Sequence, residues 1–199
     1  LGYSTVAIRD GKKELAQELA DSIADMTWAV RDVPQPAGNS PEEAVAIARD
    51  KKIARALGTV VFCDVADAPS AGTPGESTWI LKALMEKGSD LTSYVSVRDA
   101  VAAGEAWKYN TGDEITISVG GKLDTVYDKP FVFTGVVDSM QETSYGKTVI
   151  LRHDGVHLIL SELPMALKEP SDFKDLGLSV WKADIVAVKN LFPFRYNYL

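Results

Sequence analysis

The segment 64–78, DVADAPSAGTPGEST, contains the residue types, at the spacing, that are best suited to chemistry in this sequence. Asp64 and Asp67 stand three positions apart, directly after an apolar run. Carboxylates at this spacing suit general acid and base work, but they also suit hydrogen-bond anchors for the free N–H groups of a loop. We expect Asp67 to anchor the loop. Asp64 ends a predicted buried strand and therefore needs partners.

The second half of this segment predicts the start of a helix. Thr73 and Glu76 flank a proline and a glycine in the pattern of a capping box, which satisfies free N–H groups of the first turn. Such a helix start favours an anion, for example a peptide carboxylate. The candidate substrate-binding residues here are the acidic, glycine and hydroxyl residues Asp64, Asp67, Gly72, Thr73, Gly75, Glu76, Ser77 and Thr78.

The two histidines do not predict a metal site. Asp154 and Gly155 separate two apolar runs and predict a two-residue type I′ hairpin turn, in which both residues have positive φ. This turn pairs His153 with Val156 and places His157 on the opposite face of the ribbon, so the two imidazoles cannot share a metal ion. We therefore assign no metal ligands and no catalytic residues to the chain.

Arg195 is a further candidate, near the end of the chain after a run of aromatic and apolar residues. Its guanidinium suits bidentate binding of a substrate carboxylate, and it also suits an ion pair at a domain interface, the interpretation that we favour. Both interpretations remain open at the level of the sequence.

Residues 1–110 predict alternating strands and helices. Residues 4–9 (STVAIR) are typical of a strand, and the apolar residues that follow at helical spacing predict an amphipathic helix. Ser40 begins a capped helix that should run to about Leu57. GTVVFCDV then predicts a buried parallel strand, and the helix that follows residues 64–78 should end at Gly88.

Residues 111–199 predict a β-rich half. Five alternating or apolar runs there indicate strands that are mainly antiparallel: EITISV, FVFTGVV, TVILRH, VHLILS and ADIVAV. The predicted class is α/β with an α+β tendency. We expect one domain over 1–199, in which a buried mixed sheet continues from the α/β half into the antiparallel half.

Composition excludes several classes of function. The chain of 199 residues carries a formal net charge of -7, which disfavours a nucleic-acid partner. No apolar stretch reaches the roughly eighteen residues of a membrane span. Cys63 is the sole cysteine, so no disulfide framework is expected. These features are typical of a cytoplasmic protein.

The segment DVADAPSAGTPGEST resembles the signature of the MlrC family of bacterial metallopeptidases, whose pattern is close to DVADNPGGGAPGDST. SPEEAV, which begins at Ser40, and IVAVKNLFPFRYNY near the end are also similar to this family. The resemblance extends over essentially the whole chain, which begins with Leu1 and is therefore expected to be a fragment of a longer protein.

The resemblance implies a zinc peptidase in which a metal-binding N-terminal domain precedes a C-terminal domain like this one. The zinc ligands would lie upstream, so this chain would contain no cofactor and would be inactive alone. Its expected role is to help shape the substrate cleft through residues 67–78, with the N-terminal domain as its partner. The alternatives are a non-catalytic binding module for a small carboxylate or a peptide terminus, and a structural or dimerisation domain that forms a homo-oligomer.

Several positions depart from the family pattern. Ala68 replaces the usual asparagine, Ser70 and Ala71 replace glycines, and Glu76 replaces an aspartate. Pro193 stands where the family tends to have histidine. If the amide and the imidazole contact substrate in the family, this member would bind a different substrate or be catalytically weakened.

Overall fold

The computed structural model describes residues 4–33, 38–190 and 194–198, with the side chains of 194 and 195 left aside. Its contacts divide the chain into two compact units, Leu1–Gly38 and Asn39–Leu199. We refer to these as the N-terminal unit and the α/β unit. No helix among the described residues is long and apolar enough to cross a membrane. The prediction of one domain over 1–199 stays a prediction.

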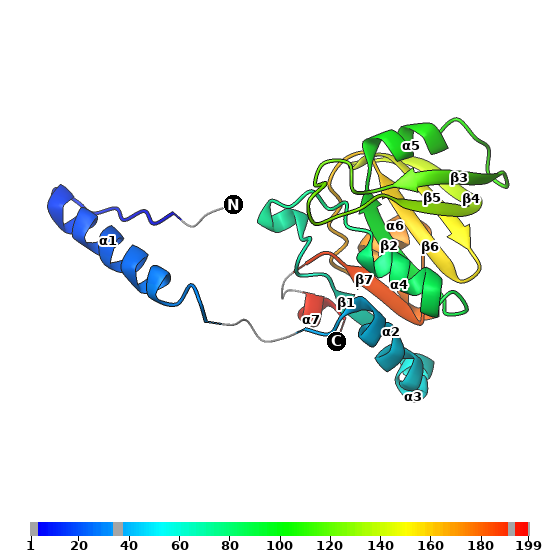
Figure 1. The fold of residues 1–199 in the computed structure, drawn as a ribbon, viewed down its shortest axis with the longest axis horizontal. Helices are drawn as coiled ribbons and strands as arrows, with labels where there is room; N and C mark the ends of the chain where they lie inside the picture. The colour runs from blue at the N-terminus through cyan, green and yellow to red at the C-terminus, as the bar shows by residue number, and fades with distance from the viewer. Residues whose placement is uncertain (1–3, 34–37, 191–193, 199) are drawn as a thin grey trace. The chain divides into compact units, whose positions relative to one another are not determined.

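The N-terminal unit contains one helix, α1 (Lys13–Ala29), as the spacing of its apolar residues predicts. The predicted strand at residues 4–9 is wrong, because this segment pairs with no other strand among the described residues. It runs back along α1 instead (Figure 1). No residue of α1 is buried.

The α/β unit is built on one mixed sheet. Its strands are β1 (Val60–Cys63), β2 (Ser93–Arg98), β3 (Glu114–Val119), β4 (Phe131–Thr143), β5 (Gly146–His153), β6 (Val156–Ser161) and β7 (Ile185–Val188). They form a 7-stranded sheet in the order β1-β7-β2-β6-β5-β4-β3. The pairings from β1 to β6 in this order are parallel, and those from β6 to β3 are antiparallel. The predicted α/β class with a mixed sheet is confirmed.

Helices and connecting segments cover one face of this sheet and, beyond β3 and β4, the other face as well (Figure 1). The remaining elements are α2 (Pro41–Asp50), α3 (Lys52–Leu57), η1 (Pro69–Ala71), α4 (Trp79–Lys87), α5 (Ala100–Ala106), α6 (Pro170–Asp175), η2 (Val180–Lys182) and α7 (Phe194–Asn197). Side chains of α2, α4 and α5 share one core with Ile185, and side chains from residues 165–183 share the other with Val186. This alternation follows from the period of two along a strand.

The helix predicted from Ser40 to Leu57 begins as expected but is broken in the middle. Ser40 and Glu43 form the capping box, with Ser40 Oγ accepting from Glu43 N at 3.2 Å and Glu43 Oε2 accepting from Ser40 N at 2.8 Å. At Lys51 the backbone leaves the helical region with ψ 48, so α2 and α3 are separate.

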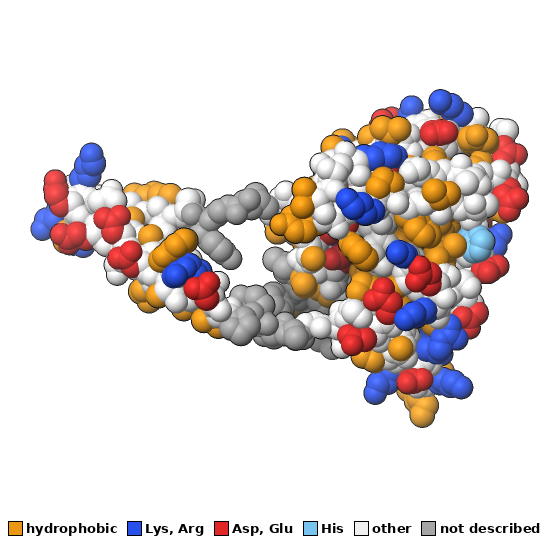
Figure 2. All heavy atoms as spheres, in the orientation of Figure 1, with side chains coloured by type: hydrophobic (Ala, Val, Ile, Leu, Met, Phe, Trp, Pro, Cys, Tyr) orange, Lys and Arg blue, Asp and Glu red, His pale blue; other side chains and the backbone are white. Residues whose placement is uncertain are grey.

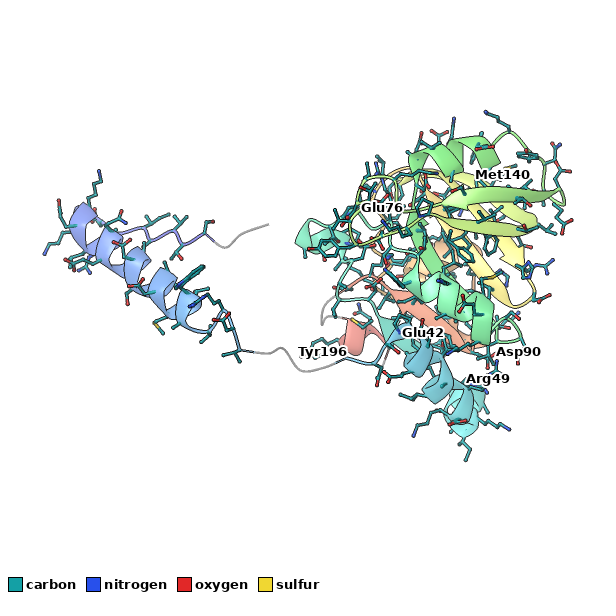
Figure 3. The ribbon with its side chains drawn as sticks, viewed as in Figure 1. Glu42, Arg49, Glu76, Asp90, Met140 and Tyr196 are labelled. Atoms are coloured by element: carbon teal, nitrogen blue, oxygen red, sulfur yellow. The ribbon has the colours of Figure 1, made fainter. Side chains whose placement is uncertain are left out.

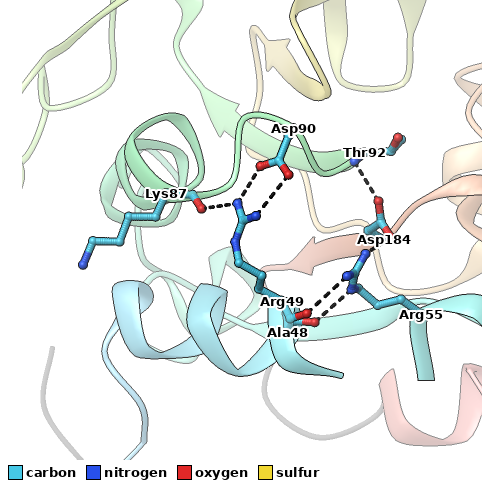
Figure 4. Close-up of polar contacts among 7 residues, drawn as sticks. All are labelled: Ala48, Arg49, Arg55, Lys87, Asp90, Thr92 and Asp184. Carbon is cyan, nitrogen blue, oxygen red and sulfur yellow. Dashed lines mark hydrogen bonds and ion pairs between the residues drawn. The ribbon is translucent and has the colours of Figure 1, made fainter. Parts of the chain in front are cut away.

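Two arginines near this break attach α2 and α3 to the rest of the unit (Figure 4). Arg49 donates to both carboxylate oxygens of Asp90, at 3.0 and 2.5 Å, and to Lys87 O at 2.6 Å. Arg55 pairs with Asp184, which stands just before β7. Arg55 therefore ties the short α3 to the sheet where helical hydrogen bonding is interrupted.

The hairpin between β5 and β6 has the predicted register, but its turn differs from type I′. His153 pairs with Val156. Asp154 has φ 49, whereas Gly155 lies outside the left-handed region. The space around Gly155 gives the reason for a glycine here: a Cβ would lie 2.5 Å from the carbonyl oxygen of Leu91.

We predict that Gly155→Ala lowers the free energy of unfolding by about 1–3 kcal/mol, because the new methyl group overlaps the backbone at Leu91. Gly104→Ala is the matched control, since a Cβ there meets nothing within 4 Å. In the helix α5 this control should raise stability by roughly 0.5–1 kcal/mol. Urea unfolding of the two variants measures the difference; equal values would contradict the close approach.

Candidate functional site

Residues 64–78, which we call the motif loop, follow β1 and end where α4 begins. The loop lies at the carboxyl end of the parallel strands, where ligands bind in many open α/β sheets. Asp64 N donates to Val188 O at 2.9 Å, and Arg98 N donates to Gly75 O at 2.8 Å. The loop is thus attached to the ends of both β7 and β2.

A buried ion cluster stands at the base of the motif loop. Lys189 directly follows β7, and its side chain is only 4% exposed. Its Nζ lies 3.1 Å from Asp64 Oδ2 and 2.8 Å from Asp67 Oδ2. Asp64 Oδ1 also accepts from Asp67 N at 3.2 Å. The partners expected for Asp64 at the end of its buried strand are therefore the ammonium group of Lys189 and the backbone amide of Asp67.

Asp67 organises the rest of the loop. Its Oδ1 accepts from Gly75 N and its Oδ2 from Ser77 N, both at 2.7 Å. Burial by itself would raise the pKa of Asp67, but the charge of Lys189 and these hydrogen bonds outweigh burial and lower the pKa below its usual value. Gly75 has φ 78, and a Cβ there would lie 2.9 Å from the ring of Pro69. Asp67 thus anchors the loop as expected.

The predicted capping box of Thr73 and Glu76 is wrong. α4 begins at Trp79, and its N-cap residue Thr78 makes no capping hydrogen bond through its side chain. Gly75 has a left-handed backbone conformation, so residues 73–76 do not form the first turn of the helix. Glu76 faces another loop, and Figure 3 shows it among the loops beside α5 and β3.

Glu76 binds the backbone of residues 120–130, which we call the β3–β4 loop. Its Oε1 accepts from Leu123 N at 2.7 Å and from Asp124 N at 2.5 Å, and its Oε2 accepts from Lys122 N at 3.0 Å. Glu76 is only 1% exposed. A buried carboxylate with three backbone donors is fully used as a structural anchor.

A second carboxylate, Asp99, holds the same loop from the other side. It caps α5 by accepting from Val101 N and Ala102 N through Oδ1. Its Oδ2 accepts from Gly120 N at 2.9 Å and from Lys122 Nζ at 2.6 Å. The start of the β3–β4 loop is therefore fixed to both α5 and the motif loop.

Ser77 and Thr78 contact the far end of the β3–β4 loop. Thr78 Oγ1 donates to Lys129 O at 3.0 Å. Asp128 is buried, and desolvation raises its pKa, as does the nearby charge of Asp67, while a hydrogen bond with Ser77 lowers it. Of the three hydroxyl residues predicted for the site, Ser77 and Thr78 thus connect the two loops.

A small hollow lies behind the motif loop, but it is too narrow for a water-sized sphere. Its lining includes Asp64, Ser77, Ser96 and Lys189. Lys189 faces it already paired with two carboxylates. A small carboxylate would therefore find neither room nor a free cation there in this conformation.

The exposed residues of the motif loop are Val65, Ala66 and those of its tip, Ser70, Ala71 and Gly72. η1 forms the tip, and Gly72 ends it with φ 89. The hydroxyl of Thr73 is buried and has no hydrogen-bond partner. The structure thus places the predicted residues from Asp64 to Thr78 in one loop that hydrogen bonds and ion pairs hold, with its tip at the surface.

The side chain of Arg195 and the residue Pro193 lie outside the described part of the chain. Among the described residues, no group of three or more histidine, cysteine, aspartate or glutamate side chains could hold a metal ion. His153 Nδ1 lies 2.7 Å from Thr134 O, whereas His157 packs edge-on against Tyr94. The carboxylates of the motif loop are taken by backbone donors and lysine, so the described residues do not fit a zinc ion.

Three charged residues that hold the motif loop and the β3–β4 loop were not identified from the sequence. Lys189 directly follows an apolar run, as Asp64 does, and a charged side chain at that position needs a partner. Asp99 precedes an alanine-rich helical run and could have been identified as an N-cap residue. Asp128 carries no comparable signal in the sequence.

We predict that Lys189→Met destabilises the α/β unit by roughly 3–5 kcal/mol, because it leaves the buried Asp67 and the partly buried Asp64 without their counter-charge. The exposed Lys182→Met should change stability by less than about 0.5 kcal/mol. Adding Asp64→Asn and Asp67→Asn to Lys189→Met should restore part of the loss. Urea unfolding tests this, and an equal loss in the single and triple variants would argue against the ion cluster.

The two buried aspartates predict opposite dependences of stability on pH. The lowered pKa of Asp67 contributes stability that is present above its unfolded value, 3.8, and is lost as the pH falls through the folded pKa. The raised pKa of Asp128 contributes stability below 3.8 that is lost as the pH rises through its folded pKa.

Asp67→Asn should therefore weaken the loss of stability in acid, and Asp128→Asn should raise stability at neutral pH more than at acidic pH. Unfolding curves over this range, compared with the unsubstituted chain, measure both differences. The same direction of change in both variants would contradict this assignment.

Comparisons with known proteins identify the family and the fold of the chain. Microcystinase C of Sphingomonas sp is 22% identical over 210 residues, which cover 100% of this chain and 41% of that protein. The crystal structure named "Putative metallopeptidase" from Mesorhizobium sp. BNC1 has the same fold, with a TM-score of 0.78 at 20% identity over 94% of this chain and 39% of that chain. The chain thus spans about two fifths of the length of these relatives. Residues 62–198 match the family described as MlrC C-terminus, and the chain belongs to that family.

Proposed function

We propose that this chain is the C-terminal domain of an MlrC-like metallopeptidase and that its motif loop forms part of the wall of a substrate cleft. Catalysis would belong to a metal-binding N-terminal domain of the same longer protein. The names of the two relatives, a microcystinase and a metallopeptidase, support this proposal, as does their greater length.

The observation that carries the proposal is the rigid construction of the loop. Asp67 and Glu76 are both buried and bind backbone amides on two sides. A loop held in this way presents its tip with little loss of conformational entropy on binding, which is the requirement for a substrate-positioning wall. Neither carboxylate is left to act as an acid, a base or a metal ligand.

Zinc in the N-terminal domain would activate a water molecule for attack on a peptide bond. The described residues of this chain would act beside it by shaping the cleft and excluding solvent. The narrow hollow behind the loop and the full pairing of Lys189 give less support to an independent site for a small carboxylate.

An exposed apolar patch lies beside the motif loop and supports docking of another domain there. Trp79 Nε1 donates to Tyr127 O at 3.2 Å, which brings the start of α4 next to the β3–β4 loop. The exposed apolar side chains at this place are Trp79, Leu123, Val126 and Tyr127. Apolar residues gathered beside polar loops are typical of an interaction surface.

Ala68 bears on the departures from the family pattern. Its side chain is fully buried, so a side chain at this position does not reach the surface of the loop. An asparagine here would act on the loop's internal hydrogen bonding, and only indirectly on a substrate. The idea that this departure weakens catalysis stays a prediction.

We predict that Ala71→Arg in the longer protein lowers kcat/KM for short linear peptides by roughly tenfold or more, since a bulky cation at the exposed tip would obstruct the cleft. Metal content and thermal stability should not change. Val132→Arg is the control, because Val132 is exposed on β4. Equal peptidase activity in the two variants would show that the tip does not line the cleft.

The chain of residues 1–199 should hydrolyse none of these peptides by itself, with or without added zinc. Turnover by the purified chain, sensitive to chelators and proportional to its concentration, would refute the proposed division of labour.

A further inference from the structure

The N-terminal unit exposes an apolar stripe along α1. Leu15, Leu19, Ile23 and Met26 follow one another at intervals of four, four and three residues, which places them on one face of the helix. They are 37%, 55%, 41% and 68% exposed. Figure 2 shows hydrophobic side chains at the surface of this unit.

Residues 4–9 add an unpaired extended segment to this helix. Val6 is 79% exposed and Ile8 is 94% exposed, while Thr5 and Ala7 between them are partly buried. This alternation is typical of a strand. No described residue forms a ladder with the segment. The segment thus has the sequence pattern of a strand but no hydrogen-bonded neighbouring strand among the described residues.

These features cannot stabilise a folded unit by themselves. α1 has 17 residues, none of them buried, and its N-cap Lys12 makes no capping hydrogen bond through its side chain. Isolated helices of this length are marginal in water, and a unit of this size buries too little surface to fold alone. The stripe and the strand-like segment therefore need a partner, which should be a sheet with one free edge and one free face.

The α/β unit does not offer a matching sheet. Strands β1, β2, β5, β6 and β7 pack against α2, α4 and α5 on one face and residues 165–183 on the other. The exposed face of the edge strand β3 presents Glu114, Thr116 and Ser118, polar side chains that do not suit an apolar stripe. The family match begins only at residue 62, whereas Microcystinase C aligns with 100% of this chain and extends well beyond it. The N-terminal unit thus has its counterpart in a longer protein, outside the part that matches the C-terminal family.

We infer that residues 4–30 are a strand and helix that complete the sheet of another α/β domain in the same polypeptide. Residues 4–9 add to an edge of that sheet as a strand, and the stripe of α1 covers its face. This rests on the proposed function only in placing the chain within a longer protein. The domain that matches the family then begins close to Asn39.

Amide hydrogen exchange on the chain 1–199 and on the longer protein tests this inference without any measurement of activity. Residues 4–9 and α1 should exchange rapidly in the chain alone and roughly 100-fold more slowly in the longer protein. Slow exchange in the monomeric chain would show that the unit packs on the α/β unit. Protection that rises with chain concentration would show that a second copy covers the unit. Rapid exchange in the longer protein would show that no other domain covers residues 4–9 and α1. Each of these three results overturns the inference.

Paired substitutions locate the contact. Leu19→Lys combined with Ile23→Lys should lower the Tm of the longer protein by roughly 5 °C or more and leave the unfolding of the α/β unit in the chain 1–199 unchanged. Gln17→Lys, on the opposite face of α1, is the control and should change neither. Equal shifts for the stripe and control variants in the longer protein would refute the proposed face. Failure of the peptidase proposal would alter none of these readouts.

Discussion

Buried carboxylates that bind backbone N–H groups are the interaction on which the loops of this protein depend. Asp67, Glu76 and Asp99 each lose their hydration on folding, and each regains hydrogen bonds from a different stretch of backbone. Leaving such a group without partners would be costly, so the three carboxylates specify one arrangement of the loops. Lys189 completes the arrangement by supplying charge where Asp64 and Asp67 approach each other.

This constraint changes what the family signature means physically. The acidic residues of the signature resemble catalytic groups when read as a sequence, yet here their oxygens are occupied by the chain itself. They hold the motif loop, with its tip Ser70 to Gly72, at the carboxyl edge of the parallel strands. Under the proposed function, such a domain contributes shape to a site whose reacting groups belong elsewhere.

The two units differ in how much of their own apolar surface they bury. In the α/β unit, alternating side chains of one sheet fill two cores. In the N-terminal unit, a helix and a strand-like segment expose the residues that a sheet would cover. We infer from this difference that the N-terminal unit requires another domain, which is the arrangement expected where a protein passes from one domain to the next.

The sequence by itself determined the family, the strands of the sheet, the capped start of α2 at Ser40 and the register of the hairpin, because these depend on neighbours in the chain. It predicted a strand at residues 4–9, which form no ladder with the described residues, and a capping box at Thr73, which is absent, because both depend on partners remote in sequence. The motif loop follows β1 and the β3–β4 loop follows β3, at opposite edges of the sheet. Only the tertiary structure brings these loops together, so that Glu76 binds backbone amides 46 to 48 positions away.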